Sequence, residues 1–245
     1  MCIDILIALK NSFTSLKNFK TWLPFLLLYM IVIHPTLHLA GIIDAKALTK
    51  SFLRSIYVPV MVYVILLTST FFLSPLAIVM CIDQSINQRP LSKSLDLALK
   101  KYVRVLLFNG ISLVISLLIS SIGLGILLLP LAFLAFFYVY PMIVLGRRDL
   151  VSTVEKNFKL VEKFFKKTFI SSLVITLTNF LLFLIGLMLI GLYVFFFVTP
   201  DTYAIFETPH LQVISVSLSS LMALLTSLIL SFQTRIYLRL RSRRR

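Results

Sequence analysis

The chain has 245 residues, of which 59% are hydrophobic and only 13% are charged. Soluble domains usually carry roughly a quarter charged residues, because a surface that faces water must be solvated. The composition therefore excludes an ordinary soluble protein. A formal net charge of +15 would suggest a nucleic-acid partner in a soluble chain, but here the basic residues stand in short blocks between long apolar runs. That arrangement is typical of membrane proteins and predicts no nucleic-acid partner.

Six apolar stretches are long enough to cross a bilayer, which requires about 20 residues of helix for a core about 30 Å thick. The sequence predicts an all-α, polytopic helical bundle that forms a single membrane domain over residues 1–245. The predicted spans are 22–41, 58–80, 105–122, 126–146, 169–198 and 211–232. His34, Pro35 and His38 interrupt the first span, so a re-entrant first segment remains the alternative.

The basic residues predict the orientation. With the N-terminus inside, 21 of the 24 Lys and Arg residues fall in inside segments, and only Lys46, Lys50 and Arg54 fall outside. Cytoplasmic loops carry such an excess of basic residues. The sequence therefore predicts a multi-pass protein of the cell membrane with both termini in the cytoplasm. Cys2 and Cys81 then lie on the reducing side, and no structural disulfide is expected.

Cationic segments with helical periodicity precede three of the spans, at about 3–16, 91–102 and 151–165. Within each segment apolar residues recur at helical spacing, and lysines occupy other positions. Ser152 and Glu155 open the third segment at the spacing of a capping box. These patterns predict amphipathic interfacial helices and a threefold repeat of one such helix followed by a transmembrane hairpin. The alternative is that juxtamembrane loops are commonly basic and partly apolar without any repeat.

The stretch from Leu91 to about Val198 carries a recognisable pattern of residue types. It contains a hairpin with Leu129–Pro130 and later Tyr140–Val144, followed by the amphipathic segment Glu155–Lys163. In these features the chain resembles the membrane domain of some bacterial glycerophosphodiester phosphodiesterases and related stand-alone, uncharacterised integral membrane proteins of bacteria and archaea. The soluble phosphodiesterase domain has no counterpart here. Hydrolysis therefore cannot be carried over, and the resemblance implies an accessory or organising membrane module of unassigned chemistry.

The polar residues give little indication of an enzyme or a cofactor. The seven glycines show no phosphate-binding spacing, and the carboxylates fall in predicted loops. No Asp, Glu, Lys or Arg lies at mid-span, which disfavours an ion-coupled transporter. Asn109 and Asn179 do lie at mid-span, where they are candidates for the path of an uncharged solute. Hydrogen bonding between helices is the commoner reason for such residues.

Three histidines form the sharpest constellation of polar residues. His34 and His38 lie four residues apart near the outer end of the first span, and His210 opens the sixth span from the same side. Imidazole is a common zinc ligand and titrates near neutral pH. The three are candidates for a metal site or a proton-sensitive switch, although histidine pairs at this spacing also arise by chance.

These observations predict a non-enzymatic, membrane-organising or accessory module whose basic interfacial helices engage anionic lipid head groups or a partner membrane protein. The side chains expected to face the head groups are Lys156, Lys159, Lys163, Lys166 and Lys167. The alternative is a transporter or channel for a small uncharged or weakly polar solute. A metal-dependent membrane enzyme is a more distant third interpretation.

Overall fold

The computed structural model describes residues 2–46, 52–121, 130, 132–146, 149–197 and 208–242, and its regular elements within these ranges are helices. They are α1 (Cys2–Leu16), α2 (Phe19–Lys46), α3 (Phe52–Asn87), α4 (Leu91–Ser121), α6 (Val139–Leu145), α7 (Leu150–Lys163), α8 (Phe165–Phe197) and α9 (Thr208–Ser242). The prediction of an all-α protein is confirmed.

Within the described ranges, five helices contain segments long and apolar enough to cross a membrane: Phe19–Leu37, Val64–Asn87, Leu91–Ser120, Phe165–Phe197 and His210–Ser242. They identify the chain as a multi-pass membrane protein. Helix α2 runs through both Pro24 and Pro35 over 28 residues, or about 42 Å at 1.5 Å per residue. The interruption that suggested a re-entrant first segment therefore does not end the helix.

The difference between the five helices and the six predicted spans lies in the predicted span 126–146. Residues 132–145 form a short apolar segment whose helix is interrupted by a turn at 136–138, after which α6 begins. Pro141 stands in the first turn of α6, where a proline is tolerated because its missing N–H has no helical partner there. The turn interrupts the predicted span 126–146, which is not among the candidate spans of the described residues. Residues 126–129 and 131 lie outside the described part of the chain.

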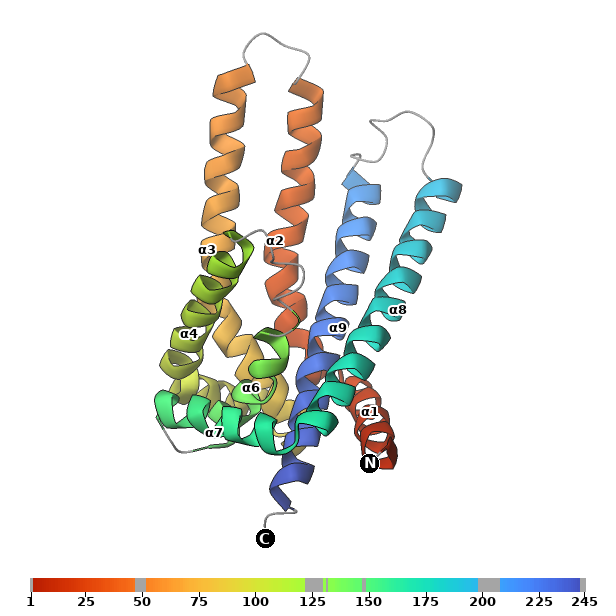
Figure 1. Cartoon of the computed structure of the whole chain (residues 1–245). Helices are drawn as coiled ribbons and strands as arrows, with labels where there is room; N and C mark the ends of the chain where they lie inside the picture. The colour runs from red at the N-terminus through yellow and green to blue at the C-terminus, as the bar shows by residue number, and fades with distance from the viewer. Residues whose placement is uncertain are drawn as a thin grey trace.

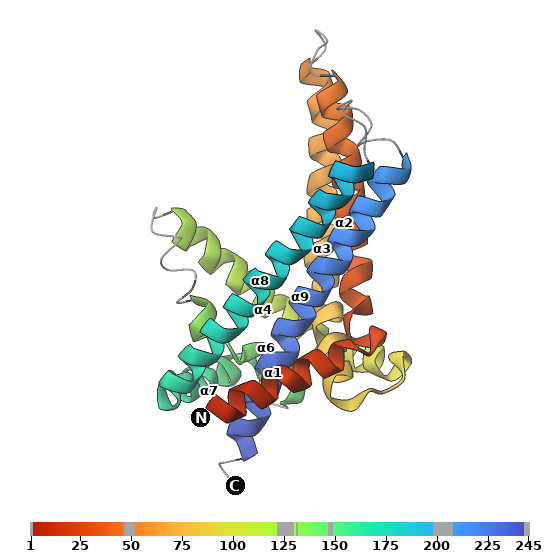
Figure 2. The same cartoon turned by 90° about the vertical axis from the view of Figure 1, so that its right-hand side faces the viewer.

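The long helices form two tall hairpins, α2–α3 and α8–α9, that rise from the same end of the molecule (Figure 1). Helix α2 packs against both α3 and α9, α4 packs against α3, and α8 packs mainly against α9. Helix α7 runs across the lower end of the bundle, and α1 lies there against α9 (Figures 1 and 2). The start of α1 and the end of α9 lie at this same end. We call it the basal end.

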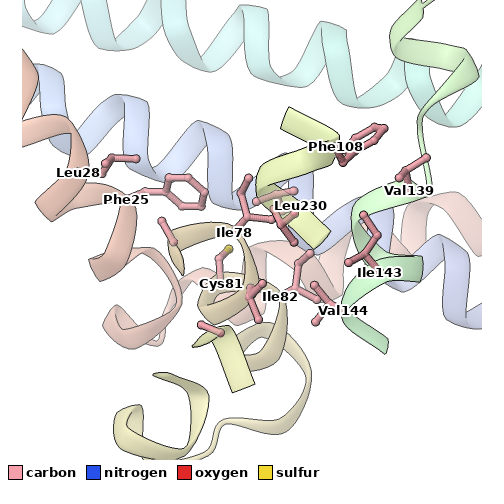
Figure 3. Close-up of a cluster of buried hydrophobic side chains, with 14 of the residues drawn as sticks. Phe25, Leu28, Ile78, Cys81, Ile82, Phe108, Val139, Ile143, Val144 and Leu230 are labelled. Carbon is pink, nitrogen blue, oxygen red and sulfur yellow. The ribbon is translucent and has the colours of Figure 1, made fainter. Parts of the chain in front are cut away.

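The hydrophobic core lies towards the basal end. Figure 3 shows one of its two clusters, which combines Phe25, Cys81, Phe108 and Leu230 from four long helices with side chains of α6. Helix α6 also contributes Met142 to the second cluster, beside residues of α1, α8 and α9. Other helices enclose α6, and this burial in protein explains why the end of the predicted fourth span is apolar.

The turn before α6 frees backbone polar groups, and α7 satisfies two of them. The Tyr138 backbone N–H donates to Asn157 Oδ1 at 3.2 Å, and Asn157 Nδ2 donates to the carbonyl of Ala135. The Asn157 side chain is completely buried. Since an unpaired buried peptide group costs roughly 1–3 kcal/mol, one carboxamide makes the interruption in the helix tolerable. Sequence analysis did not single out Asn157.

Replacing Asn157 with Leu should destabilise the fold, because it leaves both backbone groups buried and unpaired. We expect a loss of about 2 kcal/mol or more, which corresponds to a melting temperature lower by about 4–8 °C. Thermal unfolding in detergent micelles, followed by circular dichroism, measures this change. The control is Glu162→Gln on the exposed face of the same helix, which should unfold like the native protein. Equal melting temperatures for Asn157→Leu and native protein would contradict the assigned role.

Candidate functional site

Hydrogen bonds between buried polar side chains join the helices at the basal end. The Asp83 carboxylate at the end of α3 accepts from Ser94 Oγ and from Asn87 Nδ2, both at 2.7 Å. Gln84 Nε2 donates to Ser94 Oγ and to the Arg89 carbonyl, also at 2.7 Å. These bonds hold α3 and α4 together across the connection between them. We call the buried polar groups at this end the basal polar layer.

Asp4 of α1 connects the layer to two helices that are distant in the sequence. Its Oδ2 accepts from Lys167 Nζ of α8 at 3.1 Å, and its Oδ1 lies 3.3 Å from Arg239 Nη1 of α9. Arg239 Nη1 also donates to the backbone carbonyl of Asp4 at 3.1 Å. One carboxylate therefore holds α1 against the ends of α8 and α9.

Lys167 was predicted to face lipid head groups, and the structure places it elsewhere. Only 6% of the residue is exposed, and its ammonium pairs with Asp4 inside the layer. Two other basic residues also bond inward: Arg235 Nη2 donates to the Ser85 carbonyl at 2.9 Å, and Lys101 Nζ donates to the Gly146 carbonyl. These three cations therefore bond to groups of the protein itself.

The outer surface of the basal end combines exposed apolar and basic side chains. The exposed apolar residues are Ile3, Leu6, Ile7 and Phe13 of α1, Leu95 and Leu99 of α4, and Val151 and Phe158 of α7. The lysines of these segments and of the few residues that follow α1 and α7, which we call the basal lysines, are Lys10, Lys17, Lys20, Lys93, Lys100, Lys156, Lys159, Lys163 and Lys166. All are exposed except Lys156, which is half-buried. Four exposed carboxylates lie among them: Asp96, Asp149, Glu155 and Glu162.

Each of these three segments turns its other face towards the protein. The buried residues include Ile5 and Ala8 in α1, Ser94 and Ala98 in α4, and Asn157, Leu160 and Val161 in α7. Protein therefore covers the inner face, and the outer face keeps apolar surface that no described residue covers. In α1, Lys10 is exposed like Leu6 and Phe13, which precede and follow it in the sequence. Its ammonium must therefore extend past apolar neighbours to reach water or a head group.

The basal lysines of α7 make weak local contacts. Lys159 Nζ lies 2.5 Å from Glu155 Oε1, and both side chains are mostly exposed. The hydrogen bond from Lys159 lowers the pKa of Glu155. The Lys163 ammonium lies 5.8 Å from the ring centroid of Phe164. Because water screens an exposed pair of this kind, it contributes little to stability, and an anionic ligand can compete for the lysine.

Helix α7 begins one turn earlier than the predicted capping box. Asp149 is the N-cap, and its Oδ2 accepts from the Ser152 backbone N–H at 3.1 Å. Hydrogen bonds from the Ser152 side chain and backbone lower the pKa of Asp149, so the cap is ionised and suits the positive end of the helix dipole. Ser152 is therefore the third helical residue. Glu155, predicted as its capping partner, bonds to Lys159 instead.

The histidines do not converge in the described part of the chain. His34 Nδ1 lies 3.0 Å from Ser215 Oγ on α9, whereas His210 Nδ1 lies 3.0 Å from Tyr193 Oη on α8. Positions 210 and 215 are about 140° apart around α9, so the two contacts use different faces of that helix. No group of three His, Cys, Asp or Glu residues suitable for a metal occurs among the described residues. The side chain of His38 lies outside them.

The two predicted solute-path residues bond to the protein itself. Asn109 Nδ2 donates to Ser74 Oγ at 2.9 Å, and its Oδ1 accepts from the Tyr140 hydroxyl at 2.8 Å. It therefore joins α3, α4 and α6. Asn179 Nδ2 donates to the Ile175 carbonyl of its own helix at 2.8 Å, and its buried Oδ1 has no partner among the described residues.

Comparisons of the chain with protein-family models, curated proteins and solved structures found no match. The resemblance to a phosphodiesterase membrane domain therefore stays a prediction.

Proposed function

We propose that the protein is a non-enzymatic, membrane-organising or accessory module whose basal helices lie in the membrane interface and engage anionic lipid head groups. The observation that carries the proposal is the pairing of exposed apolar side chains with exposed lysines on α1, on the start of α4 and on α7. An interfacial helix buries its apolar side chains at the acyl boundary while its cationic groups meet phosphates. All three segments lie at the same end of the bundle (Figures 1 and 2).

The order of the segments supports a threefold repeat. In the proposed units, α1 precedes the α2–α3 hairpin and α7 precedes the α8–α9 hairpin. The beginning of α4 is the interfacial part of the middle unit, and its return to the basal end contains α6. The middle unit differs from the others because its returning segment is short and enclosed. Three interfacial segments in one plane give the protein a broad basic base.

The magnitude of the electrostatic attraction favours lipid as the ligand. Each lysine near an anionic membrane surface contributes about 1 kcal/mol, and less where salt screens beyond a Debye length of about 8 Å. Nine basal lysines outnumber the four exposed carboxylates about two to one. An acidic partner membrane protein would use the same lysines. Solute transport has less support, because both ends of the Asn109 carboxamide are bonded within the protein.

The proposal places the basal end, and with it both termini, at the cytoplasmic face of the cell membrane. The excess of basic residues at this end supports that orientation. The test uses two variants, Lys93→Cys and Thr202→Cys, with Cys2 replaced by Ser; Cys81 can stay because it is completely buried. A membrane-impermeant maleimide on intact cells should label only the Thr202→Cys protein. Labelling of the Lys93→Cys protein before permeabilisation would show the opposite orientation and would contradict the proposal.

Replacing four basal lysines of α7 and of the start of α8 with Gln, namely Lys156, Lys159, Lys163 and Lys166, should weaken the binding of anionic lipid. The purified protein is incubated with equal amounts of phosphatidylglycerol and phosphatidylcholine, and native mass spectrometry counts the bound molecules of each. We expect the preference for phosphatidylglycerol to fall by about tenfold or more, since each lysine contributes up to about 1 kcal/mol. High salt should reduce the preference of the native protein in the same direction.

Two controls distinguish the effect of losing surface charge from the effect of destabilising the fold. The corresponding four Lys→Arg replacements preserve charge and should preserve the lipid preference. Lys167→Gln should instead lower the melting temperature, because it leaves Asp4 without its buried partner, and should leave the lipid preference unchanged. An unchanged preference in the fourfold Gln variant would refute the proposed role of α7.

A further inference from the structure

A pocket of about 250 Å³ lies between α4, the segment before α6, and α9. Its walls are mostly apolar and include Phe108, Phe133 and Phe136. The rings of Phe108 and Phe136 meet edge to face with centroids 5.6 Å apart, which fixes their positions. The pocket is partly open, so it is continuous with the surroundings of the bundle. It is distinct from the basal lysines, none of which lines it.

Gln233 of α9 is the exceptional residue of this lining. Only 4% of the residue is exposed, and its Oε1 is enclosed without a hydrogen-bond partner in the described part of the chain. A buried polar group without a partner is costly in an apolar environment, and a ligand that supplies the partner removes this cost. Rotation about the last torsion of the side chain presents either the oxygen or the nitrogen of the carboxamide to the pocket.

Other polar atoms of the pocket can complete the contact. Ser112 and Ser116 of α4 line it, and so does Tyr140. The Tyr140 hydroxyl donates its proton to Asn109, so its oxygen remains able to accept. No Asp, Glu, Lys or Arg belongs to the described lining, and an ionised ligand group would be left unpaired there. The polar part of the ligand is therefore neutral and is both a donor and an acceptor, which describes a hydroxyl group.

The dimensions restrict the apolar part of the ligand. The lining residues of α4 run from Phe108 to Ser116, which is about 12 Å along a helix. The volume lies below the range of roughly 300–1,000 Å³ that is usual for drug-sized ligands. One hydrocarbon chain fits these limits, and two chains do not. Since the pocket is open on one side, the far end of the chain can continue into the bilayer.

We propose that this pocket binds a neutral, hydroxyl-bearing lipid with one chain, such as a long-chain alcohol. The hydroxyl donates to Gln233 Oε1, which has no partner in the described part of the chain, and the hydrocarbon chain lies between Phe108, Phe133 and Phe136. Binding of this lipid is independent of the anionic lipid at the basal lysines, so either site can exist without the other. The site takes up a membrane component from the bilayer and needs no aqueous path through the bundle.

The test uses dodecanol with a photoreactive diazirine in its chain, together with matched diazirine probes built on dodecane and dodecanoate. The full chain is placed in phosphatidylcholine nanodiscs, irradiated with each probe, digested and mapped by mass spectrometry. The alcohol should label peptides that contain residues 105–116 and 132–140, and the alkane and the carboxylate should label them less. Equal labelling by alkane and alcohol would show an apolar crevice without recognition and would overturn the proposal.

Variants identify the groups responsible. Gln233→Leu should lower labelling by the alcohol about threefold to tenfold, the value of one hydrogen bond, and should leave labelling by the alkane unchanged. Gln212→Leu makes the same replacement at an exposed position of the same helix and should have no effect. Ser112→Phe fills the pocket and should remove labelling by both probes at these peptides. Undiminished alcohol labelling in Gln233→Leu, or in Ser112→Phe, would contradict the assigned site.

Discussion

The ion pairs between Asp4, Lys167 and Arg239 are the interaction on which the arrangement of the basal end depends. Lys167 is almost fully buried, and a buried ammonium without a carboxylate is strongly destabilising. Because Asp4 belongs to α1, the first helix must lie against α8 and α9 wherever this charge is satisfied. The direction of its outer face, and hence the position of Lys10, follows from the same contact. An internal ion pair thus fixes where the external charges are presented.

The basal polar layer extends this principle to the other segments. Asp83 and Ser94 tie α3 to α4, and Asn157 ties α7 to the interrupted helix before α6. Because these groups are buried in the protein, their hydrogen-bond partners must come from the protein itself. The cationic side chains of the basal end fall into two groups, those bonded inside the protein and those on its surface. Those that bond inward hold the helices together, and most of the basal lysines lie on the exposed surface.

Sequence analysis recovered the helices that face lipid and missed the element that faces protein. Helix α8 is apolar around its whole circumference because it meets mostly lipid, and its length made it evident. The segment around α6 is equally apolar for another reason, since Val139 and Ile143 are enclosed by other helices. Composition cannot distinguish a segment that faces lipid from one that is enclosed by protein. The burial of Lys167 could not be predicted from the sequence either, because it depends on the position of Asp4, 163 residues away in the chain.

The central claim is that three segments of the basal end lie at one depth in the membrane interface. Electron paramagnetic resonance with nitroxides at Phe13, Leu95 and Phe158, exposed residues of α1, α4 and α7, measures this depth directly. Accessibility to oxygen and to a water-soluble nickel complex should place all three labels about 5–10 Å below the head groups in bilayers that contain phosphatidylglycerol. Water-like accessibility at any of the three positions, or depths that differ by more than this range, would contradict the account.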